Sequence, residues 1–550
     1  RQFEASVHES LAIYKHVSVR FVIMHTLTIL FLFIVTLFFY VYSRLKKSRR
    51  YFRDAGIPYI EPHWLFGNLK DAVLMRSSFI VELQKLYEQF EPHRFAGIYN
   101  LFNRIIIIRD PEIIKRMLIK DFSYFQDHGL PASKNVEPIL NNLFNLEGDE
   151  WKNLRIKLTG TFTSGRMKIM FPLVKKCARD IKPVLMQYAD TPEGLEIRDL
   201  CARFTTDVIG SCAFGIDTHS LQDPKSEFRQ MGKRIFEFRW QGVVRIVVPK
   251  LPDWCIKYFS LQTFDKKLSD YFLKCVKDMV KYREENNITR GDFLDILIGL
   301  KNHKEMEKLK DHHEDADLAK FMSQISDKCI KSDVEMTIEL MAAQCFIFFV
   351  GGFEGTSAAL TFLLFELAQN PHIQEKVREE IISTIESNGG EMTYDLLNKL
   401  PYTFMVLQET IRKYDLNGSI LIRKCGENYK IPDSDIIIEK GTSVFIPMNG
   451  IHHDKKYYEK PNEFYPEHFT KEAISQRHHF AYLPFGEGPR VCIAERFAKM
   501  QILMGAIYMI KDFIFELSPK TKLPLRFLPT SFGILPVEGG VWLKCRPYKA

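Results

Sequence analysis

The segment PFGEGPRVCIAERF, residues 484–497, carries the strongest fold information in this chain. It sets one cysteine, Cys492, between a turn that contains Gly486 and Gly488 and a segment typical of a helix. Glycine permits a tight turn and a close approach of backbone, and the amides at a helix N-terminus favour a thiolate. The pattern therefore predicts a thiol at the start of a helix, with Arg490 beside it.

Two interpretations of this cysteine follow from the residues alone. A thiolate is a soft, strongly donating ligand that can hold haem iron at one axial position. Phe485 would then cover the sulfur, and Arg490 would pair with a haem carboxylate. The alternative is a buried free cysteine in a turn, because free cysteines are usually buried. At this point both remain open.

The composition bounds the protein class. The chain has 550 residues, of which 46% are hydrophobic, and a net charge of +8. A chain with this hydrophobic fraction can bury a large core and is not typical of disorder. The basic excess is too small to indicate nucleic-acid binding, so we expect no nucleic-acid partner. Ten scattered cysteines without a C-x-x-C pair indicate a reducing compartment rather than a disulfide framework.

The N-terminal region predicts a membrane anchor. Residues 21–43 contain no charged residue, which is long enough for a helix to cross a bilayer. The basic run SRLKKSRRYFR follows, so the positive-inside rule places the rest of the chain in the cytoplasm. A cleaved signal peptide is the alternative, disfavoured because the apolar run is long and no small-residue cleavage site follows it. We expect an N-terminal segment with the anchor over residues 1–50 and the main globular domain over residues 51–550.

A second long apolar segment, residues 332–371, predicts a long helix. It opens with a possible capping box at Ser332 and Glu335 and stops at Pro371. Such a helix is either a second membrane span or the buried spine of a domain. We favour the spine, because a span would leave Glu354 unpaired in lipid.

Several motifs together resemble those of the cytochromes P-450. The haem-binding signature F-x-x-G-x-R-x-C-x-[G/A] is matched by residues 485–494. The other landmarks are the E-x-x-R helix at Glu409 and Arg412, the meander YPEHF at 465–469, the central helix GGFEGTS at 351–357, and W-x-x-x-R at Trp151 and Arg155. The match covers roughly residues 58–544, and it is closest to membrane-bound animal enzymes of the insect branch associated with xenobiotic oxidation.

The resemblance implies a mainly α fold with a small β-rich subdomain, the cytochrome P-450 fold, preceded by the transmembrane helix. Haem b with an axial thiolate would lie between the central helix and the Cys492 loop. The implied activity is a monooxygenase that inserts one oxygen atom from O2 into a lipophilic small molecule, either a xenobiotic or an endogenous lipid or hormone. NADPH-cytochrome reductase would supply electrons, with cytochrome b5 as a further candidate donor. The implied location is the endoplasmic reticulum membrane, single-pass, with the catalytic domain facing the cytoplasm.

The resemblance also implies roles for individual residues. Cys492 would be the metal ligand, with Phe485 and Gly488 shaping its loop. Glu409 and Arg412 would be structural, with His468 as the third member of their cluster. The haem propionates would be held by Trp151, Arg155, Arg423, Arg490 and His128.

The central helix departs from the family pattern. Gly355 stands where the family usually has a hydroxyl residue that delivers protons during oxygen activation. Thr356 follows it, but one helical step rotates a side chain by about 100°. A local bulge at the preceding glycines could re-register Thr356, or water near Glu354 could supply the protons. Glu354 and Thr356 are thus the catalytic candidates.

This departure leaves two rival functions open. One is a haem-thiolate isomerase or peroxide-rearranging enzyme, which needs no proton delivery. The other is a non-catalytic haem- or lipophile-binding protein.

Two surfaces are predicted to make contacts outside the site. Apolar residues within 239–254 would insert shallowly into the membrane, and a basic cluster would bind the reductase. That cluster comprises Lys152, Lys157, Arg166 and Lys168.

Overall fold

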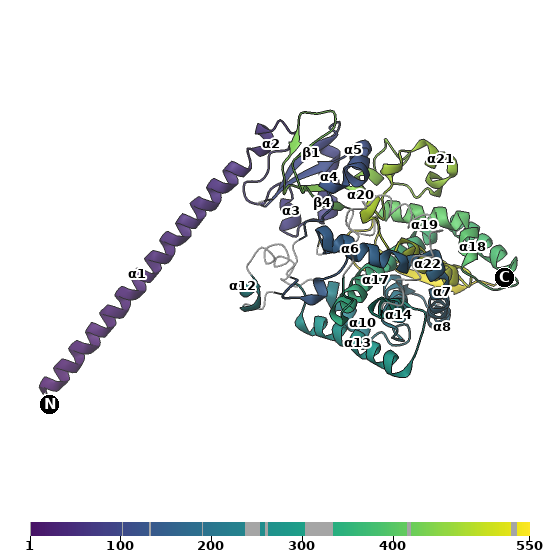
Figure 1. Cartoon of the computed structure of the whole chain (residues 1–550), viewed down its shortest axis with the longest axis horizontal. Helices are drawn as coiled ribbons and strands as arrows, with labels where there is room; N and C mark the ends of the chain where they lie inside the picture. Colours follow the sequence, from purple (N-terminus) through teal and green to yellow (C-terminus); the bar gives the residue numbers. More distant parts are fainter. Residues whose placement is uncertain are drawn as a thin grey trace.

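The computed structural model describes residues 2–101, 103–130, 134–189, 191–236, 253–258, 262–302, 334–414, 420–529 and 536–549, and of residues 2–20, 22, 236 and 253 the backbone alone. Helix α1 (Gln2–Ser48) projects from the body as a long rod (Figure 1). Its large apolar side chains between Phe21 and Tyr42 are exposed, and nothing in the described chain covers them. An apolar helix of this length, uncovered by protein, is suited to span a bilayer.

Helix α17 (Ile338–Gln369) lies at the centre of the body. It is the second helix long and apolar enough to cross a membrane, but 72% of its apolar window is buried inside the protein. The interpretation as a buried spine is therefore confirmed. The predicted capping box is wrong in position: Thr337 caps the helix by accepting from the Leu340 amide, Glu335 precedes it, and Ser332 lies outside the described residues.

Further helices pack around α17, as Figure 1 shows. The next helix after the spine, α18 (Pro371–Glu386), begins at the proline that was predicted to end the spine. The other helices that contact α17 are α9 (Ile197–Ile209), α13 (Lys266–Asn286), α14 (Phe293–Lys301), α19 (Pro401–Tyr414) and α22 (Glu495–Ile510). Helices α6 (Gly148–Thr159), α7 (Ser164–Arg179), α8 (Ile181–Tyr188) and α10 (Glu227–Phe236) pack mainly against other elements.

The sheets are small and join distant parts of the chain. The largest has the order β1-β2-β7-β4, in which β1 and β2 form an antiparallel hairpin and β2 runs parallel to β7. The second has the order β3-β9-β8 and is antiparallel. The strands are β1 (Phe95–Asn100), β2 (Asn103–Ile108), β3 (Leu195–Glu196), β4 (Leu421–Lys424), β7 (Ser443–Ile446), β8 (Phe513–Leu517) and β9 (Trp542–Pro547), with a further pair of β5 (Tyr429–Lys430) and β6 (Ile437–Ile438). The prediction of a mainly α fold with a small β-rich part is confirmed.

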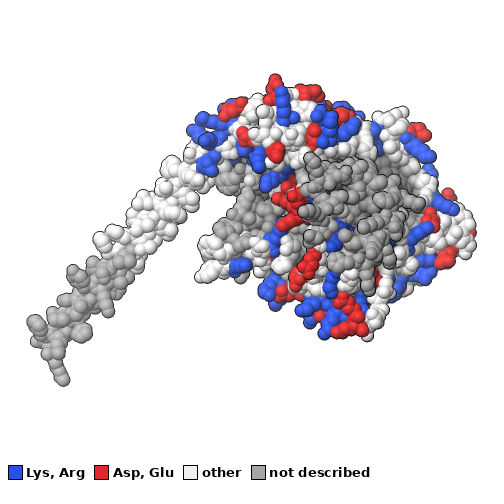
Figure 2. Space-filling model, in the orientation of Figure 1, with Lys and Arg blue, Asp and Glu red and all other residues white. Residues whose placement is uncertain are grey.

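The visible surface of the body carries charges of both signs in mixture (Figure 2). The part of α1 that is drawn in white shows no charged residue until the helix approaches the body. This contrast fits an apolar anchor attached to a water-facing domain.

Candidate active site

The loop that carries Cys492 is fixed by its own backbone. The Cys492 amide donates to the Phe485 carbonyl at 2.9 Å, and the Gly486 amide donates to the Leu483 carbonyl at 3.0 Å. Gly488 has φ +76°, and a Cβ there would lie 2.0 Å from the Leu118 carbonyl oxygen. Both the positive φ and this close approach require glycine, as the sequence predicted.

The Cys492 side chain is accessible although the thiol lies deep within the protein, so it borders an interior space. Burial raises the pKa of the thiol, while the Ala494 amide and the charge of Arg155 act in the opposite direction. A bound metal ion favours the thiolate further. Ala494, in place of the usual glycine, caps α22 at φ −101°, which any residue adopts.

One face of α17 is accessible in the middle of an otherwise buried helix. Ile347, Val350, Gly351 and Glu354 are at least partly exposed, and their i, i+3, i+4, i+7 spacing places them on one face. A Cβ on Gly351 would meet no atom within 4 Å. We name these four residues the accessible face.

The accessible face and the cysteine loop lie against the same connecting segment. Gln344, one turn before the accessible face, donates to the Asn141 carbonyl and accepts from the Leu143 amide, both at 3.0 Å. Arg490 donates to the Leu146 carbonyl at 2.8 Å and to the Gln126 carbonyl at 2.9 Å. Residues 126–146 therefore connect α17 to the loop of Cys492.

Thr356 does not lie on the accessible face. Helix α17 is continuous from Ile338 to Gln369, so the bulge that would re-register Thr356 is not found. Five residues after Gly351, Thr356 is turned by about 140° around the axis, and it is 3% exposed. Gly355 lies about 40° from Gly351, so the hydroxyl that the family usually has at this position is missing from the open side.

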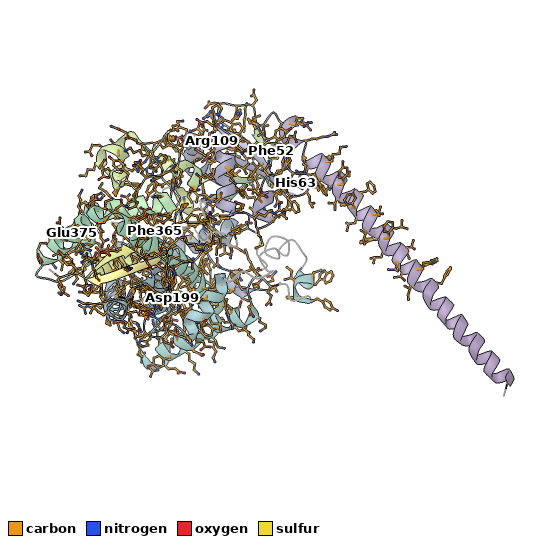
Figure 3. The ribbon with its side chains drawn as sticks, turned by 180° about the vertical axis from the view of Figure 1, so that it is seen from behind. Phe52, His63, Arg109, Asp199, Phe365 and Glu375 are labelled. Carbon is orange, nitrogen blue, oxygen red and sulfur yellow. The ribbon has the colours of Figure 1, made fainter. Side chains whose placement is uncertain are left out.

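Glu354 forms an ion pair that sequence reasoning missed. Its carboxylate accepts from Arg198 in the first turn of α9, and both side chains are largely buried. The next residue, Asp199, labelled in Figure 3, pairs with Arg229 of α10 at 2.5 Å. The first turn of α9 thus ties α17 to α10. A pocket beside this pair is lined by Arg198, Thr361 and Val541 and includes no residue of the cysteine loop.

Four predicted propionate-binding groups lie near one another. Burial lowers the pKa of Arg423 to about 10 and that of Arg155 to about 10. The pKa of Arg490 falls to about 9, through burial first and then the charge of Arg423. Burial, followed by the charges of Arg423 and Arg490, holds the pKa of His128 well below its usual range. The charge of Arg155 also lowers the pKa of Arg490. Because charge effects on a pKa need short distances, these four groups share one region.

The partners of these groups fit a dianionic ligand. Arg423 is 2% exposed, its Nη1 donates to the Ile422 carbonyl, and its Nε is buried without a hydrogen-bond partner among the described residues. Arg490 stacks 3.9 Å over the ring of Trp151, and its carboxylate neighbour Asp127 is 3.5 Å away and partly exposed. Buried guanidinium groups with so little negative charge fit the two carboxylates of haem b.

The remaining two predicted residues are also placed by the structure. His128 bonds the Phe144 carbonyl through Nδ1 at 3.0 Å. Phe485 is half-buried, with Lys499 Nζ 5.3 Å from its ring centre. His128 thus lies in the segment that Arg490 contacts, and Phe485 lies in the cysteine loop itself.

The predicted pair of Glu409 and Arg412 is confirmed. Both side chains are fully buried, and two hydrogen bonds of 2.7 and 2.8 Å join them. His468 of the meander lies 3.1 Å from Glu409, and the Tyr465 amide donates to the same carboxylate at 2.9 Å. Burial alone would raise the pKa of Glu409, but the hydrogen bonds from Arg412 and His468 outweigh it and hold that pKa below its usual value.

The predicted basic docking cluster needs correction. Lys157 is 6% exposed and donates to the Val334 carbonyl at 2.7 Å, so it does not belong to a surface patch. Lys168 is exposed but pairs with Asp395 at 2.9 Å. Most of the predicted membrane-insertion segment, residues 239–252, lies outside the described residues; Trp254, its last residue, is 67% exposed.

Known proteins match this chain over most of its length. The family model described as Cytochrome P450 matches residues 57–541. The chain is 39% identical over 509 residues to "Probable cytochrome P450 6a14" of Drosophila melanogaster, which covers 92% of this chain and 96% of that protein. It is 36% identical to "Cytochrome P450 6k1" of Blattella germanica, which covers 91% of this chain and 93% of that protein. With this match and the thiol loop described above, the chain belongs to the cytochrome P450 family, the haem-thiolate monooxygenases that bind haem b through a cysteine thiolate.

Proposed function

We propose that this protein oxidises lipophilic small molecules, inserting one oxygen atom from O2 with electrons that NADPH-cytochrome reductase delivers. The observation that carries the proposal is the accessible thiol of Cys492, deep in the protein and flanked by buried arginines. The haem supplies the activation of dioxygen; the chain supplies the ligand, the charge balance and the pocket. Cytochrome b5 is a further candidate electron donor.

The residues that would hold the haem are proposed as follows. Cys492 is the axial ligand, because its loop presents the sulfur and the Ala494 amide supports the thiolate. Arg423, Arg490 and Arg155 balance the two carboxylates, with Trp151 and His128 completing their surroundings. Gly488 permits the cysteine loop to approach the Leu118 carbonyl, and the Phe485 ring would cover the sulfur.

A lipophilic substrate is supported by the accessible face of α17. Ile347 and Val350 present apolar surface there, and Gly351 leaves room. An apolar surface of this character favours contact with apolar molecules through the hydrophobic effect. Glu354, held by Arg198, is the one residue of the accessible face that can carry a proton.

The location follows from the anchor. Helix α1, through residues 21–43, would cross the endoplasmic reticulum membrane once, and residues 51–550 would form a catalytic domain on the cytoplasmic side. The basic residues that follow the apolar run support this orientation.

Electron coupling tests the proposed function. The full chain is reconstituted with the reductase in phospholipid vesicles, and the fraction of NADPH electrons recovered in oxidised product rather than hydrogen peroxide is measured across a panel of lipophilic substrates. Substantial product supports the monooxygenase. Peroxide alone across the panel would refute it.

The geometry of α17 favours a second candidate. Because Gly355 lacks the usual hydroxyl and Thr356 is buried away from the accessible face, a rearrangement that needs no proton delivery is the alternative. Product formation from a peroxide substrate without NADPH would identify it. Gly355→Thr should raise coupling in a monooxygenase, whereas Thr356→Val, on the buried side, should leave coupling unchanged.

A further inference from the structure

A histidine outside the predicted site connects the buried Glu409–Arg412 pair to the cysteine loop. His452, the last residue of α20 (Met448–His452), is 1% exposed. Its backbone carbonyl accepts from Arg412 Nη1 at 2.7 Å. Its Nε2 lies 3.2 Å from the Leu483 amide, which donates to it. His452 therefore contacts both the buried Glu409–Arg412 pair and the residue that precedes the cysteine loop.

The protonation of this histidine follows from its contacts. Because the Leu483 amide donates to Nε2, that nitrogen carries no hydrogen, and the neutral ring holds its proton on Nδ1. Nδ1 is buried and has no hydrogen-bond partner among the described residues. Burial, and then the charges of His453 and Arg412, hold the pKa of His452 well below its usual range. The Nδ1–H is therefore unsatisfied, which is unfavourable. The other ring nitrogen, Nε2, accepts from the Leu483 amide and holds the loop.

The amide that His452 accepts from stands directly before the cysteine loop. Leu483 precedes Pro484, which has no amide hydrogen. The Leu483 carbonyl accepts from the Gly486 amide at 3.0 Å, and the Phe485 carbonyl accepts from the Cys492 amide at 2.9 Å. Successive contacts thus run from Arg412 through His452 to the turn that positions Cys492.

Other side chains hold the residues just before this point but not the Leu483 amide. Tyr458 donates its hydroxyl to the Ala481 carbonyl at 3.0 Å, and Tyr482 donates to the Gln408 carbonyl at 3.1 Å. The ring of Tyr482 lies 5.4 Å from that of His452 and supports it by packing. Loss of the histidine acceptor would therefore release the first residue of the loop while its neighbours stay attached.

We propose that His452 is a positioning residue for the haem ligand: by accepting from the Leu483 amide, it fixes the start of the loop and thereby the place of the Cys492 sulfur. This rests on the proposed role of Cys492 as the axial ligand. The contacts of His452 are with Arg412, Leu483 and the rings of Tyr458 and Tyr482, so it would act on the sulfur through residues 483–486.

The test compares two substitutions of His452 with one of its neighbour. His452→Gln retains an acceptor oxygen, and His452→Leu removes the acceptor at similar size. The matched control is His453→Gln, because His453 bonds the Asn449 carbonyl of its own helix at 2.9 Å and does not contact the loop. Each full-length, haem-loaded variant is examined by amide hydrogen exchange at Leu483 and by the absorption of its reduced carbon monoxide complex, which distinguishes thiolate from thiol ligation.

His452→Leu is expected to speed exchange at Leu483 about fivefold, as for the loss of one ordinary hydrogen bond, and to increase the thiol-ligated fraction. His452→Gln should restore most of both signals, and His453→Gln should change neither. Should His452→Leu fail to fold, His452→Asn, whose oxygen stops short of the amide, provides the same comparison. Unchanged exchange at Leu483, or equal effects of all variants, would overturn the proposal.

The two readouts separate this inference from the proposed function. Faster exchange at Leu483 with unchanged ligation in His452→Leu would overturn the positioning role, while Cys492 could still be the ligand. Absence of a thiolate signal in the unmodified protein would instead overturn the proposed ligand.

Discussion

Arg423 should destabilise the haem-free protein and stabilise the haem-bound one. Burial lowers its pKa to about 10, a fall of about 2.5 pH units that corresponds to about 3 kcal/mol of unfavourable free energy for the charged side chain. The side chain is fully buried and forms no ion pair in the described part of the chain, so little screening by solvent reduces this figure. Arg423→Met removes the buried charge and keeps most of the apolar volume. The free energy of unfolding of the haem-free protein should therefore rise, by up to about 3 kcal/mol.

The haem-bound protein should respond in the opposite direction. If Arg423 pairs with a propionate, Arg423→Met leaves a carboxylate without its partner, and haem affinity should fall by about 30-fold or more. Denaturant unfolding of haem-depleted and haem-loaded protein measures the first effect. The rate of haem transfer to an excess of a haem-accepting protein measures the second.

Arg378 is the matched control. Like Arg423 it is almost fully buried, but its Nε donates to the Ile510 carbonyl at 3.0 Å and its Nη2 to Gln374 at 2.9 Å. Arg378→Met should thus lower the stability of both forms and leave haem transfer unchanged. Equal destabilisation of the haem-free protein by Arg423→Met and Arg378→Met would show that Arg423 is satisfied within the protein, and the reasoning would be refuted.

Further outcomes follow from backbone geometry and from the buried acid. Gly488→Ala should abolish haem incorporation, because its Cβ would lie 2.0 Å from a carbonyl oxygen; Gly389→Ala, at φ +69° with open space around it, should keep normal haem content and lose only about 1 kcal/mol. Glu409→Gln should lower the free energy of unfolding by about 3–5 kcal/mol in denaturant titrations, since it leaves Arg412 buried without its partner; an unchanged midpoint would contradict this. Because the pKa of Glu409 is lowered by folding, its contribution is present above the usual carboxyl pKa and is lost as pH falls through the lowered value. Glu409→Gln should therefore show a weaker loss of stability in acid than the unmodified protein.

Features that depend on residues close together in the chain could be predicted from the sequence. The spacing of Glu409 and Arg412 places both on one helix face, so their pairing could be read directly. The glycines of the cysteine loop predicted a tight turn, and Gly488 has a positive φ. The uncharged, mostly apolar run of residues 21–43 predicted a membrane anchor, and the body of the protein does not cover that helix.

Features that depend on contacts between distant parts of the chain could not be predicted from the sequence. Arg198 lies 156 residues before Glu354, and nothing in either segment indicates that the two helices cross there. The sequence does not distinguish Lys157 from the other basic residues of the predicted docking cluster, but in α6 its side chain is buried and donates to the Val334 carbonyl. Thr337, five residues after the predicted cap, accepts from the Leu340 amide and caps α17, and the sequence pattern did not distinguish it.

Proton supply is the step where this chain should differ most from a relative with the usual hydroxyl. With Gly355 on the open side and Thr356 buried, Glu354 is left as the proton-carrying residue of the accessible face, and Arg198 holds its carboxylate. Arg198→Gln should therefore change coupling strongly when residue 355 is glycine. In a Gly355→Thr background the introduced hydroxyl should share the task, so the same substitution should have a smaller effect. A double-mutant cycle on the coupled fraction measures this interaction. Strictly additive effects would mean that water reaches the site independently of Glu354, and that the ion pair serves only to join α9 to α17.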